Sequence, residues 1–410
     1  MRLLPRLYVA QPVAGANLAR SNPPAEVCRL RPPGEGGSTL RPVRGIGVKA
    51  VALIALATAG SLAIVIGGIA LRSGPDKPSP DTVVEAGSPG ALVLVDDGSS
   101  RREETSGLAV LEGRVPLRAH DRFRIGSITK TFVAVVVLQL VDEHRLGLND
   151  TLERWLPGLV PSGRRITVRQ LLAHRSGLAD YADDPDFIRR TVAQPRRQWT
   201  PRELVGVALA EGPVARPGER FAYASTNYVL LGMVVERVTG TSLESQLRRR
   251  IFAPLRLEDT TFAPDLRNSG GYAHGYAPSE HDGIVGSLAT ARDRSTVTTS
   301  WAWAAGSIVS TASDLSRFFG VLLQGRLLPP RLLELMRPAP GSRYGLGLAA
   351  FHTPCGTAIG HTGALLGTVS AAWSSRDGRR RVVAMSNSFP LSPSAGAALR
   401  RLLDASFCGA

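Results

Sequence analysis

Two side chains with the chemistry of a covalent catalyst, Ser127 and Lys130, stand three positions apart in the chain. On a helix, such positions share a face about 5–6 Å apart, so the hydroxyl and the amine come within hydrogen-bond reach. A serine hydroxyl is a weak nucleophile until an adjacent base takes its proton. A lysine among apolar neighbours, such as residues 132–137, loses charge stabilisation and can be that base. The spacing therefore predicts a serine nucleophile activated by a lysine.

The rarity of lysine strengthens this assignment. The sequence has 49 lysines and arginines, yet lysine occurs only at Lys49, Lys77 and Lys130. Arginine stays protonated in proteins, so a base at this position has to be lysine. A Ser-x-x-Lys spacing also arises by chance, and the motif alone leaves the assignment open.

The nucleophile is expected at a transition from a strand to a long apolar helix. That helix starts at Ser127 and ends before Gly147. The start of a helix carries unpaired backbone N–H groups and a partial positive charge, which suit an anionic acyl intermediate.

Strand-like runs near both ends of the folded part, with helical runs between them, predict the fold class. Residues 150–310 are mostly helical in pattern: Thr200 and Glu203 form a capping box, and a helix over 226–239 stops at Gly240. A final helix is expected at 395–405, and the strand-like runs are 91–95, 107–111, 344–348, 356–360, 367–373 and 380–386. We predict an α/β fold of the α+β type, with an antiparallel sheet built from both chain ends, flanking helices, an inserted helical lobe and a cleft between the lobes.

The first 80 residues are expected to lie outside the catalytic domain. Residues 1–49 are basic and rich in Pro, Arg and Gly, which is typical of disorder. Residues 50–71 are uncharged and long enough to cross a bilayer, and the arginines before them place the N-terminus in the cytoplasm. After the linker 72–80, the domain at 81–408 would be extracytoplasmic, either membrane-anchored or secreted if the apolar segment is a cleaved signal.

Charge and motif content exclude several classes of function. The net charge of +15 favours anionic partners, but no recognition helix, zinc-finger spacing or aromatic-interleaved basic strand predicts nucleic acid binding. The 7 histidines show no metal-binding spacing, so we expect neither a metal nor a cofactor. The absence of G-x-S-x-G removes the central motif of an α/β-hydrolase triad.

The three cysteines fall on two sides of the apolar segment. Cys28 precedes it, whereas Cys355 and Cys408 follow it. In an oxidising compartment the latter two could form one disulfide. Two free buried thiols are the alternative.

Three widely spaced blocks carry a family resemblance. They are Ser127-Ile-Thr-Lys130, Tyr223-Ala-Ser225 and His361-Thr-Gly363. They resemble the Ser-x-x-Lys, Tyr-x-Asn and His/Lys-Thr-Gly motifs of the serine penicillin-recognising enzymes, which are the DD-peptidases and class C-type β-lactamases. The likeness extends over about residues 81–408. It is closest to the secreted D-Ala-D-Ala carboxypeptidase branch, whose cysteine pair matches Cys355 and Cys408.

The resemblance implies a role for each catalytic group. Ser127 would be the acylated nucleophile, Lys130 its base, and Tyr223 the phenol that passes a proton to the leaving group. A tyrosine can do this only if cations lower its pKa of about 10, for which Lys130 and His361 are the candidates. The alternative for Tyr223 is a loop tyrosine that packs on the following helix.

The resemblance also implies a substrate-binding strand that begins at His361. The pair His361 and Thr362 would face the substrate carboxylate, and the small Gly363 would let a ligand backbone lie alongside. The backbone N–H groups of Ser127 and Ala364 would form the oxyanion hole, in which each donor is typically worth about 10²–10³-fold in rate.

Four further positions shape the functional prediction. Trp301 and Phe187 resemble aromatic positions of the cleft wall, with core packing as the alternative. Ser225 replaces the family's asparagine, which contacts the acyl-side amide. Ala349 replaces an arginine with which the carboxypeptidase branch contacts the terminal carboxylate. Both departures weaken the case for D-Ala-D-Ala peptides and leave acyl transfer intact.

We predict a serine hydrolase that forms an acyl-enzyme, of the D-alanyl-D-alanine carboxypeptidase type, acting on cell-wall peptides. β-Lactam antibiotics would be covalent ligands, and the membrane would be a partner through residues 50–71. The alternatives are an esterase or β-lactamase of the same fold and a non-catalytic penicillin- or wall-binding sensor.

Overall fold

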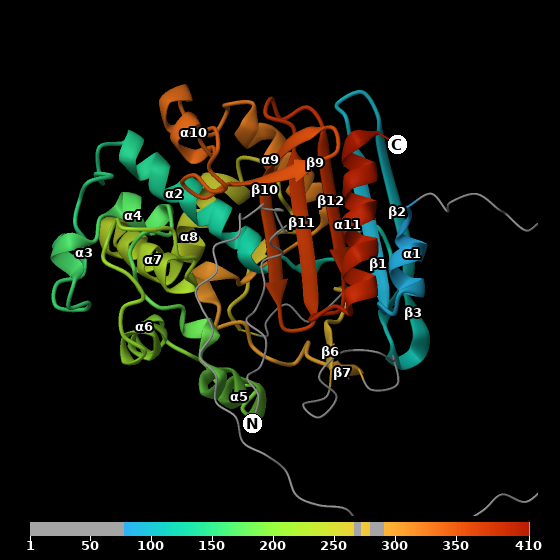
Figure 1. Ribbon diagram of the computed structural model, residues 1–410, viewed down its shortest axis with the longest axis horizontal. Helices are drawn as coiled ribbons and strands as arrows, with labels where there is room; N and C mark the ends of the chain where they lie inside the picture. Colours follow the sequence, from blue (N-terminus) through green and yellow to red (C-terminus); the bar gives the residue numbers. More distant parts are fainter. Residues whose placement is uncertain (1–77, 266–271, 279–290, 410) are drawn as a thin grey trace, which may run out of the picture. The chain divides into compact units, whose positions relative to one another are not determined.

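The computed structural model describes residues 78–265, 272–278 and 291–409 of the 410-residue chain (Figure 1). These ranges belong to one structural unit. The predicted membrane or signal segment 50–71 and the basic segment 1–49 lie outside the described residues. No helix within the described ranges is long and apolar enough to cross a bilayer.

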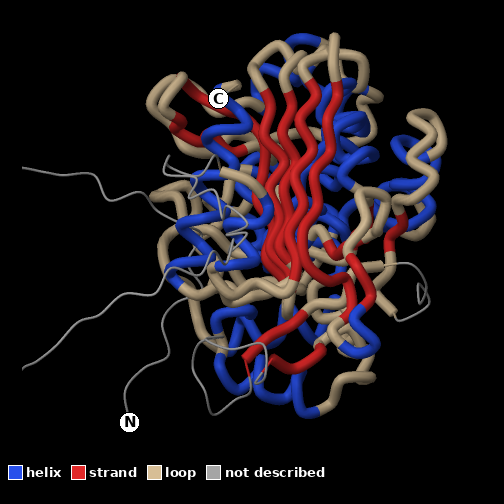
Figure 2. The backbone as a smooth tube through the Cα atoms, turned by 90° about the vertical axis from the view of Figure 1, so that its right-hand side faces the viewer, coloured by secondary structure: helices blue, strands red, loops and turns tan. Residues whose placement is uncertain are grey.

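A seven-stranded antiparallel sheet joins the two ends of the described chain (Figures 1 and 2). Its strand order is β3-β2-β1-β12-β11-β10-β9. The N-terminal strands are β1 (Gly90–Asp96), β2 (Arg101–Val110) and β3 (Val115–Pro116). The C-terminal strands are β9 (Ala349–Thr353), β10 (Gly356–Leu365), β11 (Thr368–Ser374) and β12 (Arg381–Ser386). β1 pairs with β12 and so connects the two sets. The prediction of a sheet built from both chain ends is confirmed.

The central strands are buried on both faces, and alternate residues therefore enter two different cores. In β1, Leu92 and Leu94 belong to the large core, whereas Ala91 and Val93 belong to a smaller one. The helix α9 (Ala312–Leu323) packs on the first face. The helices α1 (Pro80–Glu85) and α11 (Pro393–Cys408) pack on the second, where α11 runs along β1 and β12 (Figure 1).

The inserted lobe is mostly helical, as predicted, and is organised around one buried helix. Its helices are α2 (Thr129–Asp142), α3 (Leu152–Trp155), α4 (Val168–Leu172), α5 (Pro185–Ala193), α6 (Pro201–Ala210), α7 (Ser225–Thr239) and α8 (Leu243–Leu247). Every residue of α2 from Thr129 to Leu138 is buried, and α2 contacts α7, α8 and α10 (Pro330–Met336). The predicted capping box at Thr200 and the left-handed stop at Gly240 are both confirmed.

Besides the large sheet, the described residues contain two small sheets. One has the order β4-β8-β5, formed by Phe123–Arg124, Ile308–Ser310 and Thr261–Phe262, and the other pairs β6 (Tyr276–Pro278) with β7 (Ala291–Asp293). β4 leads through a 3₁₀ turn, Gly126–Ile128, directly into α2. This is the predicted transition from strand to helix.

The strand predicted at 344–348 is wrong. This segment forms a turn that joins β9 through a single bridge from Tyr344 to Ala349. Gly347 has a φ of 102°, a conformation that strands do not use. A side chain at Gly347 would collide with Ala134 of α2. The segment therefore turns because it packs closely against the central helix.

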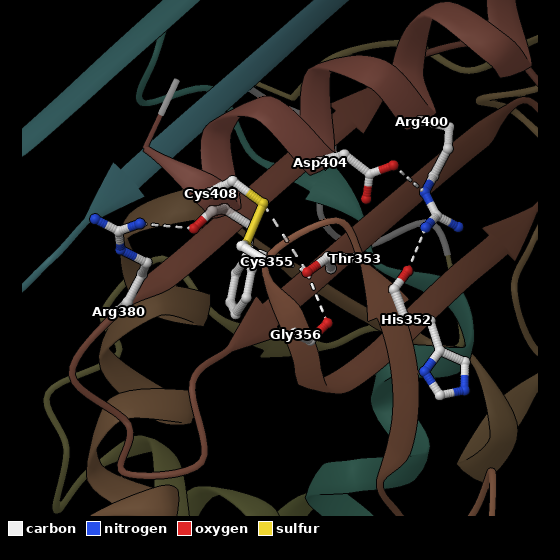
Figure 3. Close-up of a disulfide and its surroundings, with 9 residues drawn as sticks. His352, Thr353, Cys355, Gly356, Arg380, Arg400, Asp404 and Cys408 are labelled. Atoms are coloured by element: carbon white, nitrogen blue, oxygen red, sulfur yellow. Dashed lines mark hydrogen bonds and ion pairs between the residues drawn. A yellow bond between two sulfur atoms is a disulfide. The ribbon is translucent and has the colours of Figure 1, made fainter.

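A cross-link ties the β9–β10 turn to the C-terminal end of α11 (Figure 3). The structure bonds Cys355 to Cys408 and places their Cα atoms 5.6 Å apart. Nearby, Arg400 of α11 donates to the carbonyl of His352, and Arg380 Nη1 donates to the carbonyl of Phe407 at 2.7 Å. The edge of the sheet and its covering helix are thus joined by covalent and polar contacts.

Replacing both Cys355 and Cys408 by serine is expected to lower the free energy of unfolding by at most about 4 kcal/mol, because a cross-link over a separation of 53 residues restricts the unfolded chain. Urea denaturation measures the difference, and mass spectrometry of unreduced peptides tests for the bond. Reduced wild-type protein is the control and should match the double variant. Equal stability of the oxidised wild type and the variant would contradict the prediction.

Candidate active site

The predicted nucleophile and base meet at the start of α2. Ser127 lies in the 3₁₀ turn before the helix, and Lys130 lies in the first helical turn. Lys130 Nζ is 2.9 Å from Ser127 Oγ and 2.9 Å from the carbonyl oxygen of Ala305. Ser127 is partly exposed, whereas Lys130 is completely buried. The contact predicted from the spacing is therefore confirmed.

Burial makes the Lys130 amine a usable base. Desolvation lowers the pKa of Lys130 from 10.5 to about 7, while the nearby Asp180 acts in the opposite direction. The amine also lies 5.1 Å from the ring centre of Tyr223 and 5.9 Å from that of Tyr228. A base with a pKa near the working pH can both accept and return a proton.

Tyr223 completes the reacting group but does not behave as expected from the sequence. Burial raises the pKa of Tyr223 well above its usual value, and its hydrogen bond with Ser127 offsets only part of that rise. Burial also lowers the pKa of His361 to about 3, so this ring is neutral at physiological pH. The predicted lowering of the Tyr223 pKa by two cations is therefore wrong. The phenol stays protonated and can donate its proton.

His174, which the sequence did not single out as a site residue, packs against the ring of Tyr223. The two rings are stacked with centres 4.1 Å apart and planes 24° apart. His174 Nδ1 accepts the backbone N–H of Ala224 at 3.1 Å, so a neutral ring carries its proton on Nε2. Burial lowers the pKa of His174 well below its usual value. In the sequence, His174 stands outside the three motif blocks, and its spacing gives no sign of a site role.

His361 is held by Tyr344, a second residue that sequence reasoning missed as part of the site. His361 Nδ1 bonds to the carbonyl oxygen of Thr362, which can only accept, so Nδ1 carries the proton. The bare Nε2 then accepts the Tyr344 hydroxyl at 3.0 Å. The hydroxyl of Tyr228 lies against that of Tyr344. Tyr228 donates its own proton to the carbonyl oxygen of Leu172 at 3.1 Å. These bonds connect β10 with α7 and α4.

β10 lies directly against the nucleophile turn because glycines allow close backbone contact. A side chain at Gly363 would collide with the carbonyl oxygen of Ile125. Gly126 has a φ of 51°, and a Cβ there would lie 2.8 Å from the backbone nitrogen of Ala364. Thr362 is partly exposed and Ala364 is exposed, so this strand edge is accessible beside Ser127.

Ser225 and Asp180 form the opposite, helical side of the site. Ser225 Oγ lies 3.5 Å from Lys130 Nζ. Its hydroxyl and its backbone N–H both donate to the carboxylate of Asp180, which also accepts the N–H of Ala182 at 3.1 Å. Burial raises the pKa of Asp180, while the Ser225 hydrogen bonds and Lys130 oppose the rise. A single aspartate in a loop carries no motif, so the sequence did not indicate it.

Of the two aromatic residues predicted for the cleft wall, Phe187 lies in the core. Phe187 is fully buried, with its ring centre 5.4 Å from that of Tyr181 and 4.7 Å from that of Trp199. The structure thus gives it a core role in place of a cleft-wall role, because α5 turns its apolar face inward. Trp301 is 8% exposed, and its contact with substrate stays a prediction. Phe221 is 46% exposed, and its ring centre lies 5.8 Å from that of Tyr344. The sequence did not indicate this aromatic group.

In the part of the chain that the structure describes, no group of three or more His, Cys, Asp or Glu residues could hold a metal ion. The candidate site brings together a serine hydroxyl, a buried lysine amine and a buried tyrosine phenol. This arrangement is suited to acyl transfer through a serine.

The chain is similar to known serine hydrolases over most of its length. The family model described as Beta-lactamase matches residues 70–407. The fold is similar to that of a D-stereospecific amidohydrolase from Streptomyces sp., with 36% identity, a TM-score of 0.70, and coverage of 81% of this chain and 100% of that chain. It is also similar to the D-amino acid amidase from Ochrobactrum anthropi SV3 complexed with D-phenylalanine, with 28% identity, a TM-score of 0.69, and coverage of 81% and 97%.

Curated relatives include longer proteins. Penicillin-binding protein 4* of Bacillus subtilis (strain 168) is 29% identical over 203 residues, which are 47% of this chain and 42% of that protein. Protein flp of Staphylococcus aureus (strain MW2) is 30% identical over 206 residues, which are 48% of this chain and 40% of that protein. The matched part of this chain thus spans less than half the length of these two relatives.

Hydrolysis of an acyl substrate is expected to increase with pH and to level off above about 7, because Lys130 must be neutral to take the Ser127 proton and its pKa is lowered to about 7. A profile of kcat/KM against pH measures this in the free enzyme. Lys130→Arg should lose about 10²–10⁴-fold in rate, since a guanidinium cannot act as a base. Lys49→Arg, the same change outside the described residues, should keep the wild-type rate. A wild-type profile in Lys130→Arg would contradict the assignment.

Tyr344→Phe is expected to lower kcat/KM by roughly 10-fold or more, because it leaves Nε2 of buried His361 without a donor at a cost of about 1–3 kcal/mol. Steady-state kinetics measures the loss. Tyr276→Phe is a matched control, since that hydroxyl accepts the backbone N–H of Leu111 at 2.7 Å and bonds to no site residue. The control should lose stability without losing rate. Equal kinetic effects of the two changes would show that Tyr344 acts only through general stability.

Proposed function

Because the chain belongs to the beta-lactamase family of serine hydrolases, we propose that it hydrolyses amide bonds on the carboxyl side of a D-amino acid residue. The single observation that carries this proposal is the contact among Ser127, Lys130 and Tyr223 at the start of α2. The names of the two solved relatives, a D-stereospecific amidohydrolase and a D-amino acid amidase, support a D-residue on the acyl side.

Acylation uses these three groups in sequence. Ser127 Oγ forms a bond to the substrate carbonyl carbon while its proton passes to Lys130 Nζ, 2.9 Å away. The backbone N–H groups of Ser127 and Ala364 hold the oxyanion. Tyr223 then donates its phenolic proton to the leaving nitrogen, and the carbon–nitrogen bond breaks. Lys130 returns a proton to Tyr223, so that both side chains are neutral in the acyl-enzyme.

Deacylation reverses these roles with water as the nucleophile. Lys130 accepts a proton from the attacking water, and the oxygen forms a bond to the acyl carbon. The bond to Ser127 Oγ breaks as Lys130 returns that proton to the serine. The products are a carboxylic acid and the free enzyme, and every proton is accounted for.

The leaving-group side of the site favours a neutral leaving group. His361 is uncharged because burial lowers its pKa to about 3. Ala349, which pairs with Gly360 next to His361, supplies no charge. A leaving D-alanine would bring a carboxylate to this side, whereas ammonia from a carboxamide would not. We therefore place D-amino acid amides first among substrates.

A D-alanyl-D-alanine carboxypeptidase is the second candidate. Two observations favour it. One relative is named a penicillin-binding protein, and the partly exposed Thr362 has a hydroxyl that could bind a carboxylate. An extracytoplasmic location through residues 50–71, and covalent capture of β-lactams, are part of the proposal in either case. A panel of D-alaninamide, L-alaninamide, an acyl-D-Ala-D-Ala peptide, a small ester and a cephalosporin separates these substrates by kcat/KM. Preference for L-alaninamide would overturn the proposed stereochemistry.

Ser127→Ala is expected to abolish covalent labelling by a fluorescent penicillin, because the hydroxyl that forms the acyl bond is gone. Denaturing gel electrophoresis of the full chain measures the label. Ser225→Ala is the matched control, since Ser225 Oγ is the other serine hydroxyl near Lys130, at 3.5 Å. The control should still be labelled. Label that persists in Ser127→Ala and disappears in Ser225→Ala would move the nucleophile to position 225.

A further inference from the structure

One carboxylate in the site has no part in the steps above. Asp180 is partly exposed to solvent, although protein surrounds it on most sides. It hydrogen-bonds both donors of Ser225, which in turn lies 3.5 Å from Lys130 Nζ. A negative charge next to a catalytic base is costly to bury without a partner. We therefore ask which group of the substrate the Asp180 carboxylate could bind.

The position of Asp180 matches the acyl side of a bound substrate. Lys130 Nζ contacts Ser127 Oγ at 2.9 Å and Ser225 Oγ at 3.5 Å, and Ser225 reaches Asp180. In an amino acid, the α-nitrogen lies about 2.5 Å from the carbonyl carbon, as standard bond lengths dictate. Because Ser127 Oγ and Ser225 Oγ both lie beside Lys130 Nζ, we infer that the α-nitrogen of an acyl group on Ser127 is directed toward Ser225.

Helix capping accounts for only part of this arrangement. Asp180 caps a short 3₁₀ turn by accepting the N–H of Ala182, as Asp184 caps α5 by accepting the N–H of Asp186 at 2.8 Å. An ionised carboxylate offers about four acceptor sites. Asp180 uses three of them, for Ala182 and the two donors of Ser225. One acceptor site and the charge are left for a ligand.

The chemistry of the pair fits an ammonium group better than an amide. Position 225 is an asparagine in the motif that this block resembles, and a neutral carboxamide suits the N–H of an acylated nitrogen. Here the side chain is a hydroxyl that interacts with Asp180 through its proton, so its oxygen is an acceptor beside a negative charge. A free ammonium has three donors and a positive charge, which this pair can satisfy together.

We propose that Asp180 and Ser225 Oγ bind the free α-ammonium group of the substrate, so that the enzyme acts on unacylated aminoacyl compounds. The proposal rests on the proposed function, because it identifies the acyl side of the same site. It also has a consequence for the base. A bound ammonium near Lys130 disfavours a second positive charge and therefore favours the neutral amine that takes the Ser127 proton.

The test compares D-alanine p-nitroanilide with N-acetyl-D-alanine p-nitroanilide on the full chain. Wild type should prefer the free amine in kcat/KM. Asp180→Asn should lose about 10- to 100-fold on the free amine, the effect of breaking a hydrogen-bonded charge pair in a partly desolvated site. The loss on the acetylated anilide should be at least several-fold smaller, because that substrate has no ammonium group for Asp180 to bind. Both rates are compared on the pH plateau, since removing the Asp180 charge also lowers the pKa of Lys130.

Asp184→Asn is the matched control and should change neither rate. Asp180→Ser, which keeps a capping oxygen without the charge, provides the same comparison if thermal unfolding shows that Asp180→Asn is not folded. Equal losses on both anilides, or a wild-type preference for the acetylated one, would overturn the assignment and leave the acyl-enzyme on Ser127 intact. Hydrolysis of neither anilide by wild type would overturn the proposed function as well.

Discussion

The burial of one amine is the constraint on which the rest of this structure depends. Lys130 lies in a helix that is enclosed on all sides, so its charged form has lost most of its hydration. Its polar contacts are the carbonyl of Ala305 and the hydroxyls of Ser127 and Ser225, which satisfy the amine without fixing its charge. The protein thereby keeps a base available near neutral pH, at the position where the nucleophile needs it.

The neighbours of this amine follow from the same constraint. His174 and His361 are both neutral, and a charge on either would repel a protonated Lys130. Each neutral ring holds a neighbouring side chain in place. His174 stacks on the ring of Tyr223, and His361 accepts the hydroxyl of Tyr344. Neutral aromatic packing positions the phenol without stabilising its anion, so the phenol remains a proton donor.

Charge divides the site into two unlike halves. The strand side presents neutral groups, with His361 uncharged and Ala349 apolar. The helical side presents the carboxylate of Asp180 behind Ser225. A substrate that is positively charged on its acyl side and neutral on its leaving side complements both halves, which is why the two proposals agree.

The sequence by itself determined the features that depend on local spacing: the contact of Ser127 with Lys130, the helix stop at Gly240, and the strands that form one sheet from both chain ends. These depend on helix geometry, on left-handed glycine and on alternating burial, all of which act over a few residues. Only the tertiary structure decided that Asp180 lies beside Ser225 and near Lys130, and that Phe187 is buried in the core. Both outcomes depend on how distant segments pack, and no local pattern contains that information.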